Sequence, residues 1–593
     1  MKVVGGVSTD HLSRTHTQGD VMAHDRNDTP DREADHATAS RDEEEAAAHK
    51  APPMPPDSAF KLGPAGLKEK RPRLLADLQR YLDHQRHYFL GYQVNQGLDD
   101  VAYDLSDLLR VHTNNIGDPF KDSNLRTHTK PLERAVLAYY ADLWGIAPHD
   151  EKDPKSAWGY VLSMGSSEGN IYGLLNARDF VSGKHLLLER GTSESRVPRL
   201  AMAQATPVTG NPNATVPVIL FSRESHYSIA KSAHTLGIPT FGAMGNDPKR
   251  GYLKDARRVM GTPTWPTEVP SHDDGRIDVD GLVRAVDYFA EKGHPVVVVL
   301  NLGTTFKGAY DDVEEAVSRL GGVFERHGMY DREFTVERDG KKERIKRDGF
   351  WIHVDGALGA NYVPFLAKAG VAVPKFDFSL PRPGVSSIVA SGHKYPGCPW
   401  PCGVFMTRRG LQLQPPPMAD YVGSPDTTFA GSRNGFSAAV LWNFFAEHSH
   451  DDQVRMAKGC HDTAVYTARR LEEKVAPRLR ELGKDPLERE LTRHSFSVRF
   501  RAPVERIIEK YSLATVTVPF GESSVKTYVH LFTMPHVTEA LIDELIADLM
   551  EEDAFPASAV RPVATRALIP EQHTPAEETE VLYSVAMTDR GFA

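Results

Sequence analysis

The central part of the chain, between about residues 160 and 410, alternates short apolar runs with stretches of helical periodicity. Four of the runs are rich in β-branched residues: 216–222 (VPVILFS), 295–302 (PVVVVLNL), 350–355 (FWIHVD) and 386–391 (SSIVAS). Such runs are typical of strands that are buried on both faces of a sheet. Since helical stretches separate them, the pattern predicts an α/β fold with a mostly parallel sheet covered by helices.

The chain before this region changes from a polar leader to a leucine-patterned segment. Residues 1–59 contain no Phe, Trp or Tyr and carry 12 Asp and Glu against 6 Lys and Arg. This composition cannot bury enough apolar surface to offset the entropy of ordering, so it predicts a disordered acidic leader. In residues 67–85, leucines at helical spacing predict a helix with one apolar stripe, which needs a partner surface.

The chain after about residue 480 has shorter apolar runs and one more helical pattern. Residues 496–500 (FSVRF) and 527–532 (TYVHLF) predict strands, and 536–552 predicts a helix, which together indicate a smaller α+β domain. We therefore expect four parts: an acidic leader over 1–59, an N-terminal helical segment over 60–150, a large domain over 151–440 and a C-terminal α+β domain over 441–593.

Composition and charge exclude several classes of protein. The net charge of the 593-residue chain is −10, of which the leader supplies −6, so no basic surplus favours nucleic acid as a partner. Three cysteines cannot form a disulfide framework and lack the further ligands of a zinc site, so no metal is expected. The sequence shows neither a signal peptide nor a membrane-spanning apolar run. We expect a cytoplasmic protein that does not bind membranes.

Polar residues follow the predicted strands, at the sheet edge where ligands of open α/β sheets bind. Residues 165–169 (GSSEG) precede a helical pattern, whose free N–H groups and dipole could hold a phosphate. His226, Thr305 and Asp355 each follow a strand. Each feature also has an ordinary explanation, respectively a capping turn, a structural histidine, turn chemistry and a helix N-cap.

Lys394 gives these features a common chemistry. A lysine that bonds covalently to a carbonyl cofactor needs an apolar seat that lowers its pKa, and the buried run before Lys394 supplies one. Asp355, 39 residues upstream, could keep a pyridine nitrogen protonated. His226 could stack on the flat ring and residues 165–169 could anchor a phosphate. These requirements together describe pyridoxal 5′-phosphate.

The ordered motifs GSSEGN, SHYS, NLGTT, HVDGA and SGHK resemble those of the group II pyridoxal-phosphate-dependent amino-acid decarboxylases. The resemblance covers about residues 65–560, and YFLGYQVNQ, NNIGDPF and GSRNG are similar to the bacterial histidine-decarboxylase-like and valine-decarboxylase-like branch. It implies the type I fold of these enzymes, with a mostly parallel seven-stranded sheet in the large domain, an N-terminal helical segment and a smaller C-terminal α+β domain. It also implies a homodimer with shared active sites.

The resemblance also implies roles for individual residues. Lys394 would bond the cofactor and Asp355 would pair with the ring nitrogen. His226 would stack on one face of the ring, with Ala357 against the other. The remaining implied contacts are Thr305 beside the ring and, around the phosphate, Ser166, Ser167, Ser391 and His393.

Two further residues follow from the same resemblance. Ser432, in GSRNG, is implied to reach the cofactor site of the neighbouring subunit. Tyr421 lies in MADYVGSPDTTFAG, a composition that suits a mobile loop, and is one candidate for the donor of a proton to Cα, beside His226 and Lys394. Only ten residues separate Tyr421 from Ser432, a shorter spacing than in the aromatic enzymes, and packing at the dimer interface is an equal alternative for Tyr421.

The predicted reaction is decarboxylation of an L-amino acid to the primary amine and CO2. The stretches YFLGYQVNQG and HTNNIGDPF, which resemble the lining of the side-chain pocket, contain no Arg or Lys, so a neutral substrate is favoured over glutamate. Valine or a similar branched aliphatic residue is the first choice, histidine the second and aromatic residues the third. Alternatives are a decarboxylation-dependent aldehyde synthase, an aminotransferase of the same fold and an inactive interaction protein. The motif order argues against the aminotransferase, and the joint presence of Lys394, Asp355 and His226 argues against inactivity.

Overall fold

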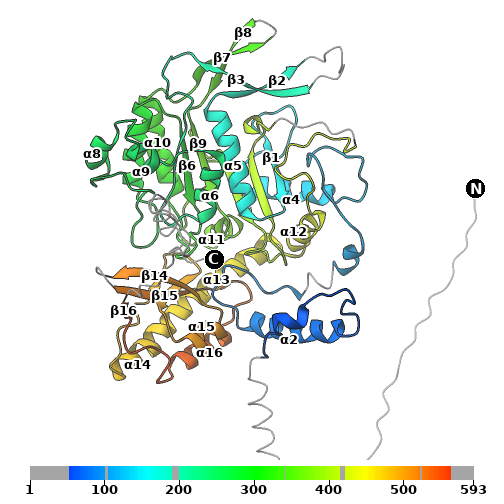
Figure 1. The fold of residues 1–593 in the computed structure, drawn as a ribbon, viewed down its shortest axis with the longest axis vertical. Helices are drawn as coiled ribbons and strands as arrows, with labels where there is room; N and C mark the ends of the chain where they lie inside the picture. Colours follow the sequence, from blue (N-terminus) through cyan, green and yellow to red (C-terminus); the bar gives the residue numbers. More distant parts are fainter. Residues whose placement is uncertain are drawn as a thin grey trace, which may run out of the picture. The chain divides into compact units, whose positions relative to one another are not determined.

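The computed structural model describes residues 52–99, 105–189, 199–338, 341–414, 421–520 and 524–562 (Figure 1). The chain forms two compact units, Met1–His84 and Gln85–Ala593. The first contains a short 3-10 turn, η1 (Asp57–Phe60), and most of helix α2 (Arg71–His87). The predicted disordered leader lies outside the described residues up to residue 51.

Helix α2 is the helix that the leucine spacing predicts. Its leucines include Leu75, which is 50% exposed, and Leu82, which is 47% exposed. No residue of α2 is buried against other described residues. The partner surface for this stripe therefore stays a prediction.

A six-stranded sheet forms the centre of the second unit, in the order β1-β11-β10-β9-β6-β5. The pairs β10–β9, β9–β6 and β6–β5 are parallel, whereas β11 runs antiparallel to both of its neighbours. The mostly parallel sheet is thus confirmed, but it has six strands in the described residues, one fewer than the resemblance implied. The strands are β1 (Ala157–Leu162), β5 (Val218–Leu220), β6 (Val296–Asn301), β9 (Phe350–Asp355), β10 (Ser387–Ser391) and β11 (Gly403–Arg408).

The four apolar runs of the sequence form the strands β5, β6, β9 and β10. The remaining strands, β1 and β11, were not predicted. Their sequences, AWGYVL and GVFMTR, each contain a glycine and few β-branched residues, so they lack the signal that marks the other strands.

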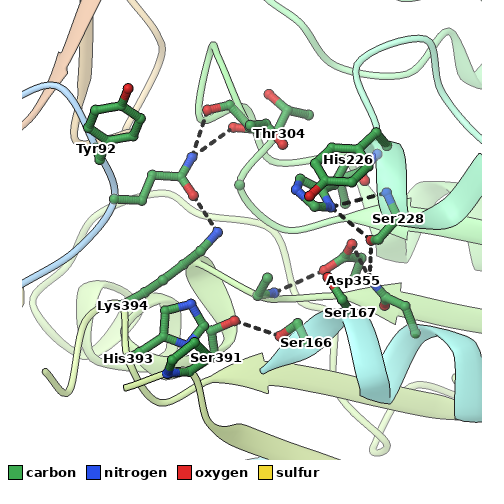
Figure 2. A pocket seen from close by; sticks show the side chains of 18 of the residues that line it. Tyr92, Ser166, Ser167, His226, Ser228, Thr304, Asp355, Ser391, His393 and Lys394 are labelled. Carbon is green, nitrogen blue, oxygen red and sulfur yellow. Dashed lines mark hydrogen bonds between the residues drawn. The ribbon is translucent and has the colours of Figure 1, made fainter. Parts of the chain in front are cut away.

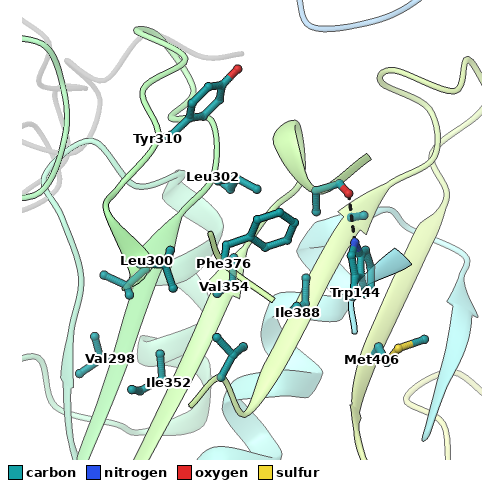
Figure 3. Packing of buried hydrophobic residues seen from close by; sticks show 14 of the residues in the cluster. Trp144, Val298, Leu300, Leu302, Tyr310, Ile352, Val354, Phe376, Ile388 and Met406 are labelled. Carbon is teal, nitrogen blue, oxygen red and sulfur yellow. Dashed lines mark hydrogen bonds between the residues drawn. The ribbon is translucent and has the colours of Figure 1, made fainter. Parts of the chain in front are cut away.

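Alternate residues of the strands face opposite sides of the sheet and pack into separate hydrophobic clusters, and β6 shows this most clearly. Val298 and Leu300 of β6 pack in one cluster with helices α9 and α10 (Figure 3), and Val297 and Val299 pack in the other with α5 and α6. Full burial of one such side chain contributes about 1.5–3 kcal/mol to the stability of the fold. Packing on both faces of the sheet therefore holds the ends of the strands in place. These helices are α5 (Ser166–Val181), α6 (Tyr227–Leu236), α9 (Val279–Glu291) and α10 (Val313–Arg326).

A second, antiparallel sheet lies near the C-terminal end of the described chain. Its order is β12-β13-β15-β14, with β16 paired to β15. The strands and the helix predicted here form as β13, β15 and α16, and they pack around a hydrophobic cluster of their own. The elements are α13 (His450–Arg470), the π-helical turn η6 (Leu471–Val475), α14 (Ala476–Glu481), β12 (Glu490–Leu491), β13 (Ser497–Arg501), α15 (Glu505–Lys510), β14 (Ala514–Phe520), β15 (Ser524–Phe532), α16 (Glu539–Leu549) and β16 (Val560–Pro562).

Two small antiparallel sheets project from the large sheet on the side away from the C-terminal sheet (Figure 1). One is the antiparallel pair β2 (Lys184–Glu189) and β3 (Arg199–Gln204), and the other is built from β4 (Thr206–Pro207), β7 (Arg332–Arg338) and β8 (Lys341–Arg347). The remaining elements are η2 (Ser106–Arg110), α4 (Lys130–Leu143), α7 (Phe241–Asn246), η3 (Leu253–Asp255), α8 (Ala256–Met260), η4 (Gly359–Asn361), α11 (Val363–Lys368), η5 (Arg409–Leu411) and α12 (Gly435–Glu447).

Candidate active site

A cavity of about 270 Å³ lies at the carboxyl ends of the central strands (Figure 2). Strands β6, β9 and β10 end there with Asn301, Asp355 and Ser391, and β15 of the C-terminal sheet contributes His530. The cavity brings together nine of the predicted residues, Ser166, Ser167, His226, Thr305, Asp355, Ala357, Ser391, His393 and Lys394. The predicted edge of the sheet is therefore where these side chains meet.

Lys394 lies just beyond strand β10, all five residues of which are buried. Its Nζ donates a hydrogen bond of 2.5 Å to Oε1 of Gln93. Burial lowers the pKa of Lys394 from 10.5 to about 8, and the nearby Asp355 carboxylate opposes this shift. Because the neutral amine is the nucleophile, the lowered pKa makes the side chain more reactive near neutral pH.

Asp355 is the last residue of strand β9 and is 5% exposed. Its Oδ2 accepts a hydrogen bond of 2.9 Å from Nδ2 of Asn170, and its Oδ1 accepts one of 3.1 Å from the backbone N–H of Ala357. Two donors thus hold the carboxylate in one orientation. An enclosed carboxylate of this kind can keep a nearby pyridine nitrogen protonated.

His226 is the N-cap residue of helix α6 and lines the cavity. Its Nδ1 lies 2.8 Å from Oγ of Ser228 and accepts the backbone N–H of Ser228 at 3.2 Å. The start of the helix therefore fixes the orientation of the imidazole ring in the cavity wall, as stacking on a flat ligand would require.

The end of the cavity at the start of helix α5 suits an anion. Oγ of Ser166, the first residue of α5, lies 2.8 Å from Oγ of Ser391 at the end of β10. Gly165 precedes the helix with φ of 68°, and a Cβ at this position would lie 2.7 Å from Cε1 of His393. The close approach and the positive φ both favour glycine here. The free N–H groups at the start of α5, with the two hydroxyls, form a ready site for a phosphate.

His393 contributes to this end as a neutral group. Its Nδ1 donates a hydrogen bond of 3.0 Å to the carbonyl oxygen of Cys402. Burial and, to a smaller degree, the charge of Lys394 together lower the pKa of His393 to about 4. Toward a phosphate the ring would therefore offer a dipole and not a positive charge.

Gln93 is a cavity residue whose contact the sequence did not predict. Besides accepting from Lys394, its amide donates a hydrogen bond of 2.7 Å to the carbonyl oxygen of Thr305. Gln93 lies in the stretch YFLGYQVNQG, which was expected to line the side-chain pocket, but nothing in the spacing singled it out. It joins the lysine to the loop after β6.

His530 also lines the cavity and was not predicted. Its Nδ1 lies 2.7 Å from the carbonyl oxygen of Phe306, and its Nε2 lies 2.9 Å from that of Gly91. The residue stands in strand β15, far along the chain from the other cavity residues, so no local pattern could have indicated it. It connects the C-terminal sheet to two loops of the cavity.

Two predicted residues are not brought to the cavity within one subunit. Tyr421 is 81% exposed and is not among the residues that line it. Ser432 lines a different surface pocket, where its Oγ accepts a hydrogen bond of 3.0 Å from Nδ2 of Asn114. The position of Ser432 is compatible with its expected reach to the cofactor site of a neighbouring subunit. For Tyr421, donation of a proton and packing at a dimer interface both stay predictions.

The residues of the cavity fit pyridoxal phosphate. Lys394 could bond its aldehyde carbon, Asp355 could face its ring nitrogen, and the start of α5 with Ser166 and Ser391 could hold its phosphate. In the described part of the chain, no group of three or more His, Cys, Asp or Glu is placed to hold a metal ion.

Among the helices that the structure describes, none is both long and apolar enough to cross a membrane.

Comparisons with known proteins agree with this geometry. Residues 92–444 match the pyridoxal-dependent decarboxylase conserved domain. The chain is 27% identical to a histidine decarboxylase of Vibrio campbellii over 477 residues, which cover 80% of this chain and 93% of that protein. It is 28% identical to serine decarboxylase 1 of Oryza sativa over 483 residues, with 81% and 76% covered.

A solved structure of another amino-acid decarboxylase also matches the chain, at higher sequence identity. The L-methionine decarboxylase of Streptomyces sp. 590, in complex with L-methionine methyl ester, is 43% identical and superposes with a TM-score of 0.76. The match covers 84% of this chain and 98% of that one. The chain therefore belongs to the pyridoxal-dependent decarboxylases, carboxy-lyases that act on amino acids with pyridoxal phosphate as their cofactor.

Proposed function

We propose that the protein decarboxylates a neutral L-amino acid with an apolar side chain, and that L-methionine is the first substrate to test. The observation that carries this proposal is the lining of the cavity. Of its described residues only Lys394 is a lysine or arginine, and Tyr92, Val94 and Met164 supply apolar surface beside it. A carboxylate side chain would be left without a cationic partner there, which is costly.

The relatives support a neutral substrate and change the order of preference within that class. Methionine and valine are both apolar, and the 43% identity to a methionine decarboxylase favours the unbranched thioether over the branched aliphatic residue that the sequence alone favoured. Histidine is the second candidate, supported by a histidine decarboxylase at 27% identity.

In the proposed reaction the protein orients the substrate and controls protons. Bound pyridoxal phosphate supplies a positively charged ring that accepts the electron pair left by departing CO2. Asp355 would keep the proton on the ring nitrogen. Lys394, near its pKa at neutral pH, could take up or release a proton beside Cα. His226 would hold the ring between itself and Ala357.

The test is a substrate panel with the purified holoenzyme. Release of CO2 and of amine is measured for each of the twenty amino acids, with Lys394→Ala as the blank. We expect L-methionine to give the highest kcat/KM, and 3-methylthiopropylamine and CO2 in equal amounts. A preference for glutamate or aspartate would contradict the proposal. Formation of aldehyde and ammonia in place of amine would instead indicate the aldehyde synthase.

A further inference from the structure

In the wall of the cavity, hydrogen bonds form one continuous chain from the central sheet to His226. Asn170, in the second turn of α5, stands at its branch point and is 1% exposed. Its Oδ1 lies 2.9 Å from Nε2 of His353. Its Nδ2 lies 2.9 Å from Oδ2 of Asp355 and 3.1 Å from Oγ of Ser228 (Figure 2). The amide thus contacts Asp355 directly and His226 through Ser228, which bonds His226.

The Asp355 carboxylate sets the direction of this chain. An ionised carboxylate only accepts, so Asn170 must turn its NH2 group toward Asp355 and its oxygen toward His353. That oxygen also only accepts, so Nε2 of His353 carries a hydrogen. Burial lowers the pKa of His353 to about 4, so the ring is neutral and its Nδ1 is an acceptor. The hydroxyl of Ser387, which accepts from Nε1 of Trp351 at 2.9 Å, can donate to this Nδ1 at 2.7 Å.

The other branch sets the state of His226. Ser228 Oγ accepts the second amide hydrogen of Asn170, so its own hydrogen is directed to Nδ1 of His226, 2.8 Å away. The backbone N–H of Ser228 faces the same Nδ1 at 3.2 Å. Because two donors face Nδ1, the neutral ring carries its hydrogen on Nε2, and protonation of Nδ1 would place hydrogen against hydrogen.

We propose that Asn170 is a positioning residue that couples Asp355 to His226. It holds the carboxylate and, through Ser228, keeps His226 in the neutral form with its hydrogen on Nε2. The role of this coupling in catalysis rests on the proposed function. There, the hydrogen fixed on Nε2 lets the His226 ring donate a hydrogen bond to the carboxylate of the amino-acid substrate. Asn170 is the last residue of the motif GSSEGN, but the motif indicates neither its contacts nor the coupling.

The hydrogen positions give a direct test. Neutron diffraction from a deuterated crystal of the holoenzyme shows which nitrogen of each histidine carries deuterium. We expect deuterium on Nε2 of His226 and of His353, and the ND2 group of Asn170 facing Asp355 and Ser228. Deuterium on Nδ1 of His226 would overturn the proposal. These positions do not depend on the substrate, so a failed amine assay with deuterium on Nε2 would remove the proposed function alone.

A variant pair tests the coupling without a crystal. In Asn170→Asp, a carboxylate replaces the donor to both Asp355 and Ser228, so it draws the Ser228 hydrogen away from Nδ1 of His226, which then faces the backbone N–H of Ser228 alone. We expect the Nε2–H signal of His226, in the 15N spectrum of histidine-labelled enzyme at one fixed pH, to shift or weaken, and kcat to fall about 10²–10⁴-fold. The matched control is Asn176→Asp, a buried residue of the same helix that contacts Tyr172 and Leu413 outside the cavity.

The control variant should keep the His226 signal and most of kcat. The signal is assigned by its absence from His226→Gln. An unchanged His226 signal in Asn170→Asp, or an equal change of it in Asn176→Asp, would contradict the coupling, because the second result would mean that any charge in α5 disturbs the ring.

Discussion

At the scale of single residues, enclosure changes the chemistry of ordinary side chains. Lys394 has its pKa lowered to about 8, while His353 and His393 have theirs lowered to about 4. In each case burial is the largest cause, because it disfavours the charged form. The cavity therefore holds the neutral imidazole of His393 and one amine that is close to losing its proton, while the neutral His353 is buried and does not line the cavity.

The lowered pKa of Lys394 predicts how the apoenzyme takes up its cofactor. Only the neutral amine can attack an aldehyde, and for a lysine with a lowered pKa the neutral fraction rises with pH through about 8 in place of 10.5. We expect the covalent attachment of pyridoxal phosphate to reach half its maximum near pH 8. The attachment is fixed with borohydride and measured by peptide mapping. Lys394→Ala should show no labelled peptide at any pH and a kcat at least about 100-fold lower. Attachment with a midpoint above pH 10, or on another lysine, would contradict this assignment.

Residue types at strand ends could be predicted, but most of their partners could not. Lys394, Asp355 and His226 each follow an apolar run, which marks the edge of the sheet without reference to any other part of the chain. Gln93 and His530 come from segments remote in sequence, and their place depends on how loops and sheets meet in space. Hydrogen-bond partners of this kind have no local periodicity to reveal them.

At the scale of elements, the start of helix α5 depends on how the chain enters it. Gly165 takes a φ of 68° and brings the backbone against His393, so that the first N–H groups of the helix face the cavity. The strands were predictable where both faces are buried and β-branched residues dominate. They were not predictable for β1 and β11, where the neighbouring strands and not the local sequence favour the extended conformation.

Substitution of Gly165 tests the phosphate site. In Gly165→Ala the added Cβ would lie 2.7 Å from His393 Cε1 and the positive φ would be strained, so the loop must shift. We expect the Kd for pyridoxal phosphate, measured by equilibrium dialysis, to increase about tenfold or more, which corresponds to about 1.4 kcal/mol. The control is Gly322→Ala in α10, where a Cβ meets nothing within 4 Å. It should leave the Kd unchanged and stabilise the helix by about 0.5–1 kcal/mol. Equal affinities of the two variants would exclude this role for the loop.

At the scale of the whole molecule, the cavity of one subunit holds most of the predicted site. Tyr421 and Ser432 lie outside it, and the resemblance implies that the segment with Ser432 reaches a neighbouring subunit. We expect a homodimer in which Tyr421 serves the partner's cavity. The roles of these two residues could be expected only from the resemblance, because contacts between subunits leave no periodic trace in one sequence. The expected domain boundaries, by contrast, came from changes in composition and periodicity along the chain.

Mixing two inactive variants tests this arrangement. Lys394→Ala and Tyr421→Ala should each be weak alone. If Tyr421 acts across the interface, each hybrid dimer contains one intact site and should regain about half of the wild-type activity, since a twofold dimer has two equivalent sites. Co-expression with two different affinity tags isolates the hybrid, and amine release is then measured. No recovery in the purified hybrid would place the action of Tyr421 within its own subunit.

The antiparallel direction of strand β11 limits how far the segment that carries Lys394 can move. Since β10 and β11 are antiparallel neighbours, Lys394 lies in the short connection 392–402, both ends of which are fixed in the centre of the sheet. The backbone carbonyl of Lys394 is also bonded to the N–H of Asn95 at 3.0 Å. Because fraying from a chain end cannot reach this segment, the bonded amide hydrogens of Gly392 and Cys398 should exchange slowly with solvent. An inserted residue here would shift the register of a strand pair, so this connection tolerates changes of length far less than the surface hairpins do.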